Sequence, residues 1–450
     1  MRQINRSHLQ ALMDREQKRF VAERPESAAL FERARKSLLG GVPMNWMAKW
    51  AGAFPPFVRE AHGSEFFDVD GHRYIDLCLG DTGAMTGHSP SATVSAVEQQ
   101  ARRGITLMLP SEDAIVVGEE LQKRFGLPYW QFVLTASDAN RFAIRLARQI
   151  TAKPKILVFN WCYHGTVDET FITLKDGVAQ ARRGNIGPPV DPRVTTRVVE
   201  FNDLDALETE LSHEDVACVL AEPAMTNMGI VLPEPGYHQA LREITRKQGT
   251  LLIIDETHTI CVGPGGYTRA ENLVPDFLIF GKPIAGGVPG AAYGFTEEVA
   301  CSIIAKQNLE DCDTGGIGGT LAGNALSLAA MRATLQKVLT PEAFARMIPM
   351  AERWTEGVSK AIVDFGLPWT VTRLGCRAEY LFSAHPPRNG TQAHDAMDFG
   401  LERFMHLYAM NRGILLTPFH NMALMSPLTS KGDIDQHTNV FRDAAKELVG

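Results

Sequence analysis

The feature that most constrains the fold is a series of short apolar runs between residues 92 and 295, separated by stretches with helical periodicity. Each run is typical of a strand buried on both faces, because it lacks the alternation of a half-exposed strand. Strands that alternate with helices in this way predict an α/β fold with a mostly parallel sheet, covered by helices on both faces. The seven predicted strands occupy residues 132–134, 156–159, 196–199, 218–221, 251–254, 277–280 and 292–295.

The chain outside this region has a different pattern and predicts a second unit. At 450 residues the chain is long enough for two packed units. A helix pair and short strands joined by an Asp70-Gly71 turn are predicted before the sheet region, and long helices with short strands after it. We therefore predict an N-terminal segment (1–75) that packs with the small domain, a large sheet-containing domain (76–325) and a small α+β domain (326–450).

Charge and composition exclude several kinds of partner. The net charge of -7 argues against nucleic acid or an anionic membrane, and no apolar run reaches membrane-spanning length. The charged start lacks the apolar stretch of a signal peptide, so we predict a cytoplasmic protein. The cysteines form no CxxC pair and are predicted to be reduced core residues, not a disulfide framework or a metal site. They are Cys78, Cys162, Cys218, Cys261, Cys301, Cys312 and Cys376.

A lysine and an aspartate follow two successive predicted strands. Asp255 comes directly after the run at 251–254, and Lys282 comes just after the run at 277–280, before a glycine-rich turn. The carboxyl ends of parallel strands meet at the edge where open α/β folds bind ligands, so both side chains are expected there. A lone lysine is more often a solvated surface charge. A lysine amine beside a buried acid suits imine chemistry, in which the amine condenses with an aldehyde and the acid holds a proton on a pyridine nitrogen.

Two stretches are candidate phosphate sites. Residues 135–140 follow a predicted strand and open a helix predicted over 141–149. Free N–H groups and hydroxyls at a helix start suit an anion, although ordinary N-capping by Ser137 is the alternative. The second candidate is the glycine run 315–319 with Thr320, a weaker signal because flexible loops look the same.

Further polar and aromatic residues end strands at the same edge. Tyr163 follows the run at 156–159, where an aromatic ring can stack on a flat heteroaromatic ring. His164 beside it is, taken alone, more often a structural histidine than a catalyst. Glu222 ends another strand, in line with Asp255, which favours a role in the site over that of a solvated cap.

The motifs together resemble the class III aminotransferases, which are pyridoxal-phosphate enzymes of fold type I. Within them the chain looks most similar to the glutamate-1-semialdehyde aminomutase branch and the β-amino-acid aminotransferases. The resemblance covers nearly the whole chain, and each motif alone is modest. The motifs that carry it are Tyr163-His164-Gly165, Glu222-Pro223, Asp255-Glu256, Lys282 with its glycine-rich follower, and residues 319–324.

The resemblance implies pyridoxal 5'-phosphate as the cofactor and a role for each matching residue. Lys282 would form the Schiff base with the cofactor and shuttle a proton, and Asp255 would pair with the pyridine nitrogen. Tyr163 would stack on one ring face, with Thr257 against the other. His258 falls where the family often has a residue that hydrogen-bonds the ring hydroxyl.

The remaining implied cofactor contacts are His164, Glu222 and the phosphate-binding residues. Ala136 and Ser137 would hold the phosphate. Thr320 would reach the phosphate of a partner subunit, so the resemblance implies a homodimer with shared active sites.

Departures from the family pattern occur in the phosphate loop and in the substrate pocket. The phosphate loop, usually Ser-Gly-Thr-Glu, is Thr-Ala-Ser-Asp at 135–138, and alanine lacks the freedom of glycine. The stretch 44–47 lacks the arginine that clamps a substrate carboxylate in the enzymes resembled, and Asn or Met cannot replace it. Asp81 stands where the family usually has an aromatic residue, and it would repel a carboxylate. We predict that Trp46, Met47 and Asp81 line the substrate pocket.

The leading functional hypothesis is a transaminase that moves an amino group between an amine or a β/ω-amino acid and a 2-oxo acid. The alternative is an aminomutase resembling glutamate-1-semialdehyde 2,1-aminomutase, or a racemase, neither of which needs a separate acceptor. A nucleotide-binding oxidoreductase is disfavoured because the glycine run at 263–266 does not lie between a strand and a helix. A cofactor-binding protein without catalysis is disfavoured by the presence of both Lys282 and Asp255.

Overall fold

The computed structural model describes residues 4–306 and 316–450; Cys312 and Gly315, both singled out in the sequence, lie outside them. The chain forms two compact units. The large unit comprises Ser91–Phe344 and Pro387–Asp395, and the small unit comprises Met1–Pro90, Ala345–Pro386 and Ala396–Gly450. The large unit thus begins and ends later in the chain than the predicted large domain, 76–325. The predicted division into three parts stays a prediction.

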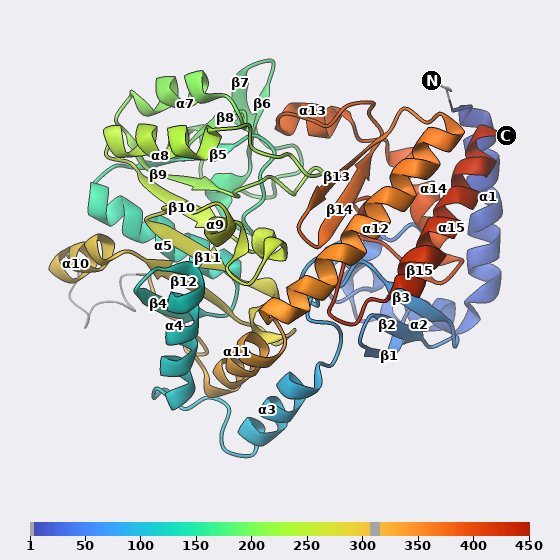
Figure 1. Cartoon of the computed structure of the whole chain (residues 1–450), viewed down its shortest axis with the longest axis horizontal. Helices are drawn as coiled ribbons and strands as arrows, with labels where there is room; N and C mark the ends of the chain where they lie inside the picture. The colour runs from blue at the N-terminus through green and yellow to red at the C-terminus, as the bar shows by residue number, and fades with distance from the viewer. Residues whose placement is uncertain (1–3, 307–315) are drawn as a thin grey trace. The chain divides into compact units, whose positions relative to one another are not determined.

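The large unit is built on a seven-stranded sheet with the strand order β4-β12-β11-β10-β9-β5-β8 (Figure 1). Only β12 runs antiparallel to its neighbours, β11 and β4. The mostly parallel seven-stranded sheet predicted from the sequence is therefore confirmed. Its strands are β4 (Tyr129–Val133), β5 (Lys155–Phe159), β8 (Thr196–Val199), β9 (Val216–Ala221), β10 (Leu251–Asp255), β11 (Phe277–Phe280) and β12 (Ala291–Phe295).

Helices cover both faces of this sheet, which explains why its strands are almost wholly apolar. On β5, Ile156 and Val158 face the core that contains α5 (Ala136–Thr151). The alternate residues Leu157 and Phe159 face a second core with α7 and α8. The other elements of the unit are α3 (Ser91–Ala101), α4 (Glu112–Phe125), α6 (Pro192–Thr195), α7 (Leu204–Leu211), α8 (Tyr237–Lys247), α9 (Gly266–Ala270), α10 (Glu297–Lys306), α11 (Ala325–Lys337), α13 (Gly390–Asp395) and a hairpin of β6 (Ile172–Lys175) and β7 (Val178–Ala181).

The small unit combines two sheets with helices, as the predicted α+β pattern requires. One sheet has the order β1-β2-β3-β15 and the other the order β13-β14-β16. Tyr74 of β3, Phe20 of α1 and Leu407 of α14 pack in one core. The elements are α1 (Arg6–Glu23), α2 (Pro25–Ala34), β1 (Val58–His62), β2 (Glu65–Asp68), β3 (Arg73–Asp76), most of α12 (Pro341–Phe365), β13 (Thr370–Leu374), β14 (Arg377–Leu381), α14 (Phe399–Met410), β15 (Ile414–Leu415), β16 (Met422–Leu424) and α15 (Lys431–Val449).

The described cysteines are thiols, all of them buried except Cys301. The prediction of core residues is therefore confirmed for the buried ones and wrong for Cys301, which lies at the surface of α10. Among the described residues, no helix combines the length and the hydropathy needed to cross a bilayer.

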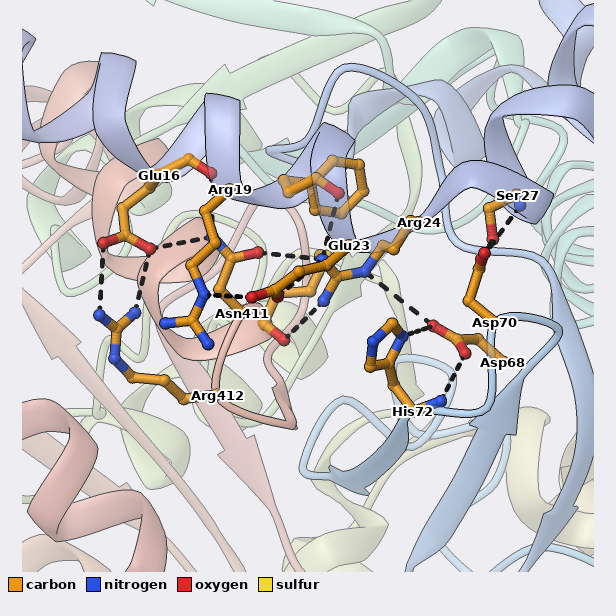
Figure 2. A network of polar contacts seen from close by, with 12 residues as sticks. Glu16, Arg19, Glu23, Arg24, Ser27, Asp68, Asp70, His72, Asn411 and Arg412 are labelled. Atoms are coloured by element: carbon orange, nitrogen blue, oxygen red, sulfur yellow. Dashed lines mark hydrogen bonds and ion pairs between the residues drawn. The ribbon is translucent and has the colours of Figure 1, made fainter.

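A network of polar side chains connects the N-terminal helices of the small unit to Asp68 of β2 and to the residues after α14 (Figure 2). The guanidinium of Arg24, only 1% exposed, donates to Tyr74 Oη at 2.9 Å and to Asn411 Oδ1 at 3.2 Å, and lies 4.0 Å from the Asp68 carboxylate. Asn411 donates to Glu16 Oε2 at 2.9 Å. A buried charge is tolerated only when it is paired and hydrogen-bonded, so each of these partners is needed.

We expect Arg24→Met to lower the free energy of unfolding by about 3 kcal/mol, because it removes the buried donor to Asn411 Oδ1 and the positive charge next to Asp68. Asp68 then keeps only its hydrogen bonds with His72 and Tyr74. Arg19→Met is the matched control. Arg19 is 41% exposed and pairs with Glu23 one helical turn away, so its loss should cost less than about 0.5 kcal/mol. The shift of the urea midpoint measures both effects, and equal shifts would contradict a structural role for the buried network.

Candidate active site

Lys282 and Asp255 lie at the same edge of the large sheet. Asp255 is the last residue of β10 and pairs in register with Ile279 of β11. Lys282 is the second residue after β11 and has a φ of 42°, which is uncommon for any residue except glycine. Strained backbone of this kind is kept where the surroundings impose it, and such places are often functional sites.

The turn that contains Gly281 and Lys282 packs closely against the start of α5. A Cβ atom on Gly281 would lie 2.9 Å from the Cβ of Ala136, so only glycine fits between Lys282 and the strand. The first turn of α5 is therefore held next to the lysine. The first N–H groups of a helix have no partner within it, so a turn of this kind can bind an anion, and its role toward a phosphate stays a prediction.

The sequence placed the start of this helix too late, because α5 begins at Ala136 and not at residue 141. The cap is Thr135, whose hydroxyl accepts from the N–H of Asp138 at 3.1 Å, so the alternative that Ser137 caps the helix is wrong. Ser137 Oγ instead accepts from the N–H of Thr166 at 3.0 Å. Ala136 and Ser137 thus lie in the first helical turn, where N–H groups point toward an anion.

The Asp255 carboxylate is buried and accepts three hydrogen bonds. His164 Nδ1 lies 3.0 Å from Oδ2, and Asn140 Nδ2 donates to the same oxygen at 2.9 Å. The backbone N–H of Thr257 donates to Oδ1 at 3.1 Å. Asn140 also donates to the carbonyl of His164 at 3.1 Å, which fixes the loop after β5 against α5.

His164 and Asp255 form a buried ion pair. Burial opposes the charge on His164, but Cys162 and the hydrogen bond to Asp255 outweigh it and raise the pKa of the imidazole to about 10. Burial would likewise raise the pKa of Asp255, yet the hydrogen bond from His164 and the other donors lower it to about 2. At neutral pH, therefore, Asp255 is a fixed negative charge at the strand edge.

A second set of polar contacts leads away from the lysine. Nζ of Lys282 contacts Nε2 of His258, and Nδ1 of His258 lies 2.8 Å from Oγ1 of Thr226. The Thr226 hydroxyl in turn donates to Oε2 of Glu222, which is 6% exposed. Lys282, His258 and Glu222, all predicted from the sequence, are thus brought together.

The other predicted cofactor residues of the large unit differ in their exposure. Tyr163 is 41% exposed and meets Phe171 edge to face, with 6.5 Å between ring centroids. Thr257 is buried beside Asp255. Thr320 is exposed in the loop ahead of α11 and lines a cavity of about 280 Å³ together with Met108. Their roles toward the cofactor stay predictions.

The predicted substrate residues Trp46, Met47 and Asp81 belong to the small unit. Trp46 packs edge to face on Phe419, with ring centroids 6.0 Å apart. Asp81 has a φ of 48° and is followed by Thr82 with a φ of 82°, a rare conformation for a β-branched residue. This strain is a reason to keep Asp81 as a functional candidate.

Sequence reasoning missed Asn140 and Thr226. Asn140 lies four residues after Ala136, on the same face of α5, and a buried polar residue at that spacing was the available signal. Thr226 lies in an irregular segment after β9, held by paired hydrogen bonds of 3.0 Å between Met225 and Val231. Nothing in its sequence neighbourhood distinguishes it from other threonines.

Comparisons with known proteins agree with this geometry. The Aminotransferase class-III family model matches residues 46–444. The curated glutamate-1-semialdehyde 2,1-aminomutase of Persephonella marina is 33% identical over 432 residues, which cover 94% of this chain and 99% of that protein. A glutamate-1-semialdehyde-aminomutase structure from Pseudomonas aeruginosa PAO1 is 48% identical, with a TM-score of 0.97 and 99% of each chain covered. An omega-transaminase structure from Sphaerobacter thermophilus is 28% identical, with a TM-score of 0.86, and covers 96% of this chain and 100% of that chain.

We expect His164→Leu to destabilise the protein by about 3 kcal/mol at neutral pH, because Asp255 then loses its buried counter-charge. Folding lowers the pKa of Asp255, so its contribution is present above the unfolded value of about 4 and is lost as pH falls toward 2. In the variant, burial without His164 raises the folded-state pKa of Asp255, so stability should no longer fall between about pH 4 and 2 and the gap to the wild type should narrow there, as melting temperatures across the acid range would show.

His238→Leu is the control for that experiment, since His238 is also buried but bonds the carbonyl of Pro223 at 2.7 Å. Burial lowers the pKa of His238 to about 4, so His238→Leu should abolish the stability loss between about pH 6.5 and 4 and leave the loss between about pH 4 and 2 in place. Identical pH profiles for the two variants would contradict the ion pair.

We expect Gly165→Ala to displace Ser137 from the first turn of α5. Gly165 has a φ of +79°, and an added Cβ would lie 2.0 Å from Ser137 Oγ. Gly177→Ala is matched in backbone angle, with a φ of +75°, but its Cβ would meet nothing within 4 Å. The control should therefore cost only the backbone strain of about 1 kcal/mol, and Gly165→Ala clearly more. Thermal melting compares them, and equal losses would show that Ser137 is not held by this contact.

Proposed function

The chain belongs to the class III aminotransferases, and from this premise we propose that it is an aminomutase, which moves an amino group within one substrate molecule. Membership of the family, whose members bind pyridoxal phosphate, confirms the predicted enzyme class, the cofactor and fold type I. A variant of the Pseudomonas enzyme has been crystallised with PMP, the amine form of this cofactor.

The residues at the sheet edge fit pyridoxal phosphate. When bound, this cofactor supplies an aldehyde that takes up an amino group and a ring that withdraws electrons from the carbon losing a proton. Asp255, held ionised by His164, would keep a proton on the pyridine nitrogen. The first turn of α5, with Ala136 and Ser137, would bind the phosphate, and Lys282 would carry the proton between carbon atoms.

The observation that carries the choice of an aminomutase is the 48% identity, across 99% of both chains, to a protein described by that activity. The omega-transaminase of similar fold is only 28% identical. The relatives therefore support the alternative of the sequence analysis better than its leading hypothesis, a transaminase. Because an aminomutase returns the amino group to the same molecule, it consumes no external 2-oxo acid.

The proposed substrate has an amine next to an aldehyde carbon, as in the glutamate 1-semialdehyde of the relatives' names, and its carboxylate, if present, must lie away from Asp81. The stretch 44–47 has no arginine for a substrate carboxylate, so Trp46, Met47 and Asp81 remain the proposed determinants of choice. We also keep the homodimer, with Thr320 reaching the phosphate of a partner subunit, as part of the proposal. A cytoplasmic location is supported by the buried thiols.

The test is conversion of glutamate 1-semialdehyde by the purified chain with pyridoxal phosphate or its amine form, without any 2-oxo acid. We expect the isomer to form, and Lys282→Ala to abolish both turnover and the absorbance of lysine-bound cofactor. Lys247→Ala, at a lysine 66% exposed and paired with Glu208, is the control and should retain activity. Product that forms only when pyruvate or 2-oxoglutarate is added would make the enzyme a transaminase.

A further inference from the structure

The loop after β5 carries Tyr163, and side chains from elsewhere in the large unit hold the backbone just before it. Nδ2 of Asn227 donates to the carbonyl of Trp161 at 2.9 Å. Nη2 of Arg182, the residue after β7, donates to the carbonyl of Cys162 at 2.7 Å. Both residues that precede Tyr163 thus have their carbonyl groups fixed by partners outside the loop.

Trp161 has a strained backbone conformation. Its φ is 64°, in the left-handed region, which is uncommon for a residue with a bulky side chain. The indole ring stacks on the imidazole of His394 in α13, with 3.9 Å between the ring centroids and 18° between the ring planes. The guanidinium carbon of Arg182 lies 5.7 Å from the centroid of the same indole. These contacts stabilise the ring and so offset the strain of its backbone.

Arg182 connects this ring to Tyr163. Its guanidinium carbon also lies 5.8 Å from the ring centroid of Phe171, and its backbone N–H donates to the carbonyl of Phe171 at 2.9 Å. Phe171 in turn meets the ring of Tyr163 edge to face, with 6.5 Å between the centroids. Arg182 therefore contacts both the backbone that precedes Tyr163 and the aromatic ring against which Tyr163 packs.

Tyr163 is 41% exposed, so burial alone does not fix its ring. A side chain that becomes ordered only on binding opposes binding, because it loses conformational entropy at that moment. A guanidinium group is planar and rigid, so it loses little freedom when it packs against rings and donates to a carbonyl. Arg182 therefore holds the loop and Phe171 in one arrangement before any cofactor binds, and Tyr163 is pre-organised with them.

We propose that Arg182 and Trp161 are positioning residues for Tyr163, which hold its ring in the orientation that stacks on pyridoxal phosphate. They are not catalytic residues, because their contacts are with the loop and with Phe171. The inference rests on the cofactor part of the proposed function and not on the reaction that the enzyme catalyses. Binding of pyridoxal phosphate without any substrate therefore separates failure of this inference from failure of the proposed aminomutase activity.

The test is a double-mutant cycle on the dissociation constant of pyridoxal phosphate, obtained by titrating the cofactor-free full-length chain and following the absorbance of lysine-bound cofactor. We expect Arg182→Met to weaken binding about tenfold, the loss expected when one aromatic contact is misplaced. Tyr163→Ala should weaken binding by a similar factor, and the double variant should bind no more weakly than Tyr163→Ala alone. A loss of about 100-fold in the double variant would show that Arg182 does not act through Tyr163, and would overturn the proposal.

Arg183→Met is the matched control, since Arg183 is the next residue in the chain and is exposed, and it should bind the cofactor as tightly as the wild type. Trp161→Gly serves if Arg182→Met does not fold, because glycine adopts the left-handed backbone without strain and only the indole is lost. We expect it to weaken binding in the same way, and to have no further effect once Tyr163 is alanine. Wild-type affinity in folded Arg182→Met, in Trp161→Gly or in Tyr163→Ala would contradict the positioning role, even if the enzyme proved to be an aminomutase.

Discussion

The local structure at the sheet edge depends on one buried negative charge, the carboxylate of Asp255. An ionised carboxylate is costly to bury unless donors surround it, and here the donors come from three segments of the chain. Asn140 lies on α5, His164 on the loop after β5, and the N–H of Thr257 in the turn after β10. To satisfy one charge, the fold must bring these three segments together, and Ala136 at the start of α5 lies against Gly281, the residue before Lys282.

The meeting of Asp255, Lys282 and Glu222 at one edge of the sheet could be predicted from the sequence, because the buried strands give the strongest sequence signals. Runs such as 251–254 and 277–280 are too apolar to lie anywhere but in a doubly covered strand. Once they are parallel neighbours, Asp255 and Lys282 must emerge at the same edge, and Glu222 joins them for the same reason. The arrangement of these residues follows from hydrophobic burial and strand direction alone.

The features that sequence could not supply depend on side-chain direction and on backbone angles. Asn140 is polar in an otherwise apolar face of α5, and its hydrogen bonds to Asp255 and to the carbonyl of His164 explain its burial. The start of α5 was misplaced because Thr135, Ser137 and Asp138 are all acceptable caps, and the geometry of the preceding strand decides between them. The left-handed backbone at Lys282 has no signature in its neighbours, since the glycines that follow it would permit many conformations.

Two polar clusters lie at this edge of the sheet, one around Asp255 and one around Lys282. Around Asp255 the pKa of the carboxylate is lowered and that of His164 is raised, so neither group changes its charge near neutral pH. Such a pair can hold a proton on a bound ring but cannot move one. The other cluster contains the lysine amine, with Nε2 of His258 against Nζ and Oγ1 of Thr226 2.8 Å from Nδ1 of the same ring. The sheet edge thus holds its buried ion pair and its amine on separate side chains, although both clusters include the turn after β10.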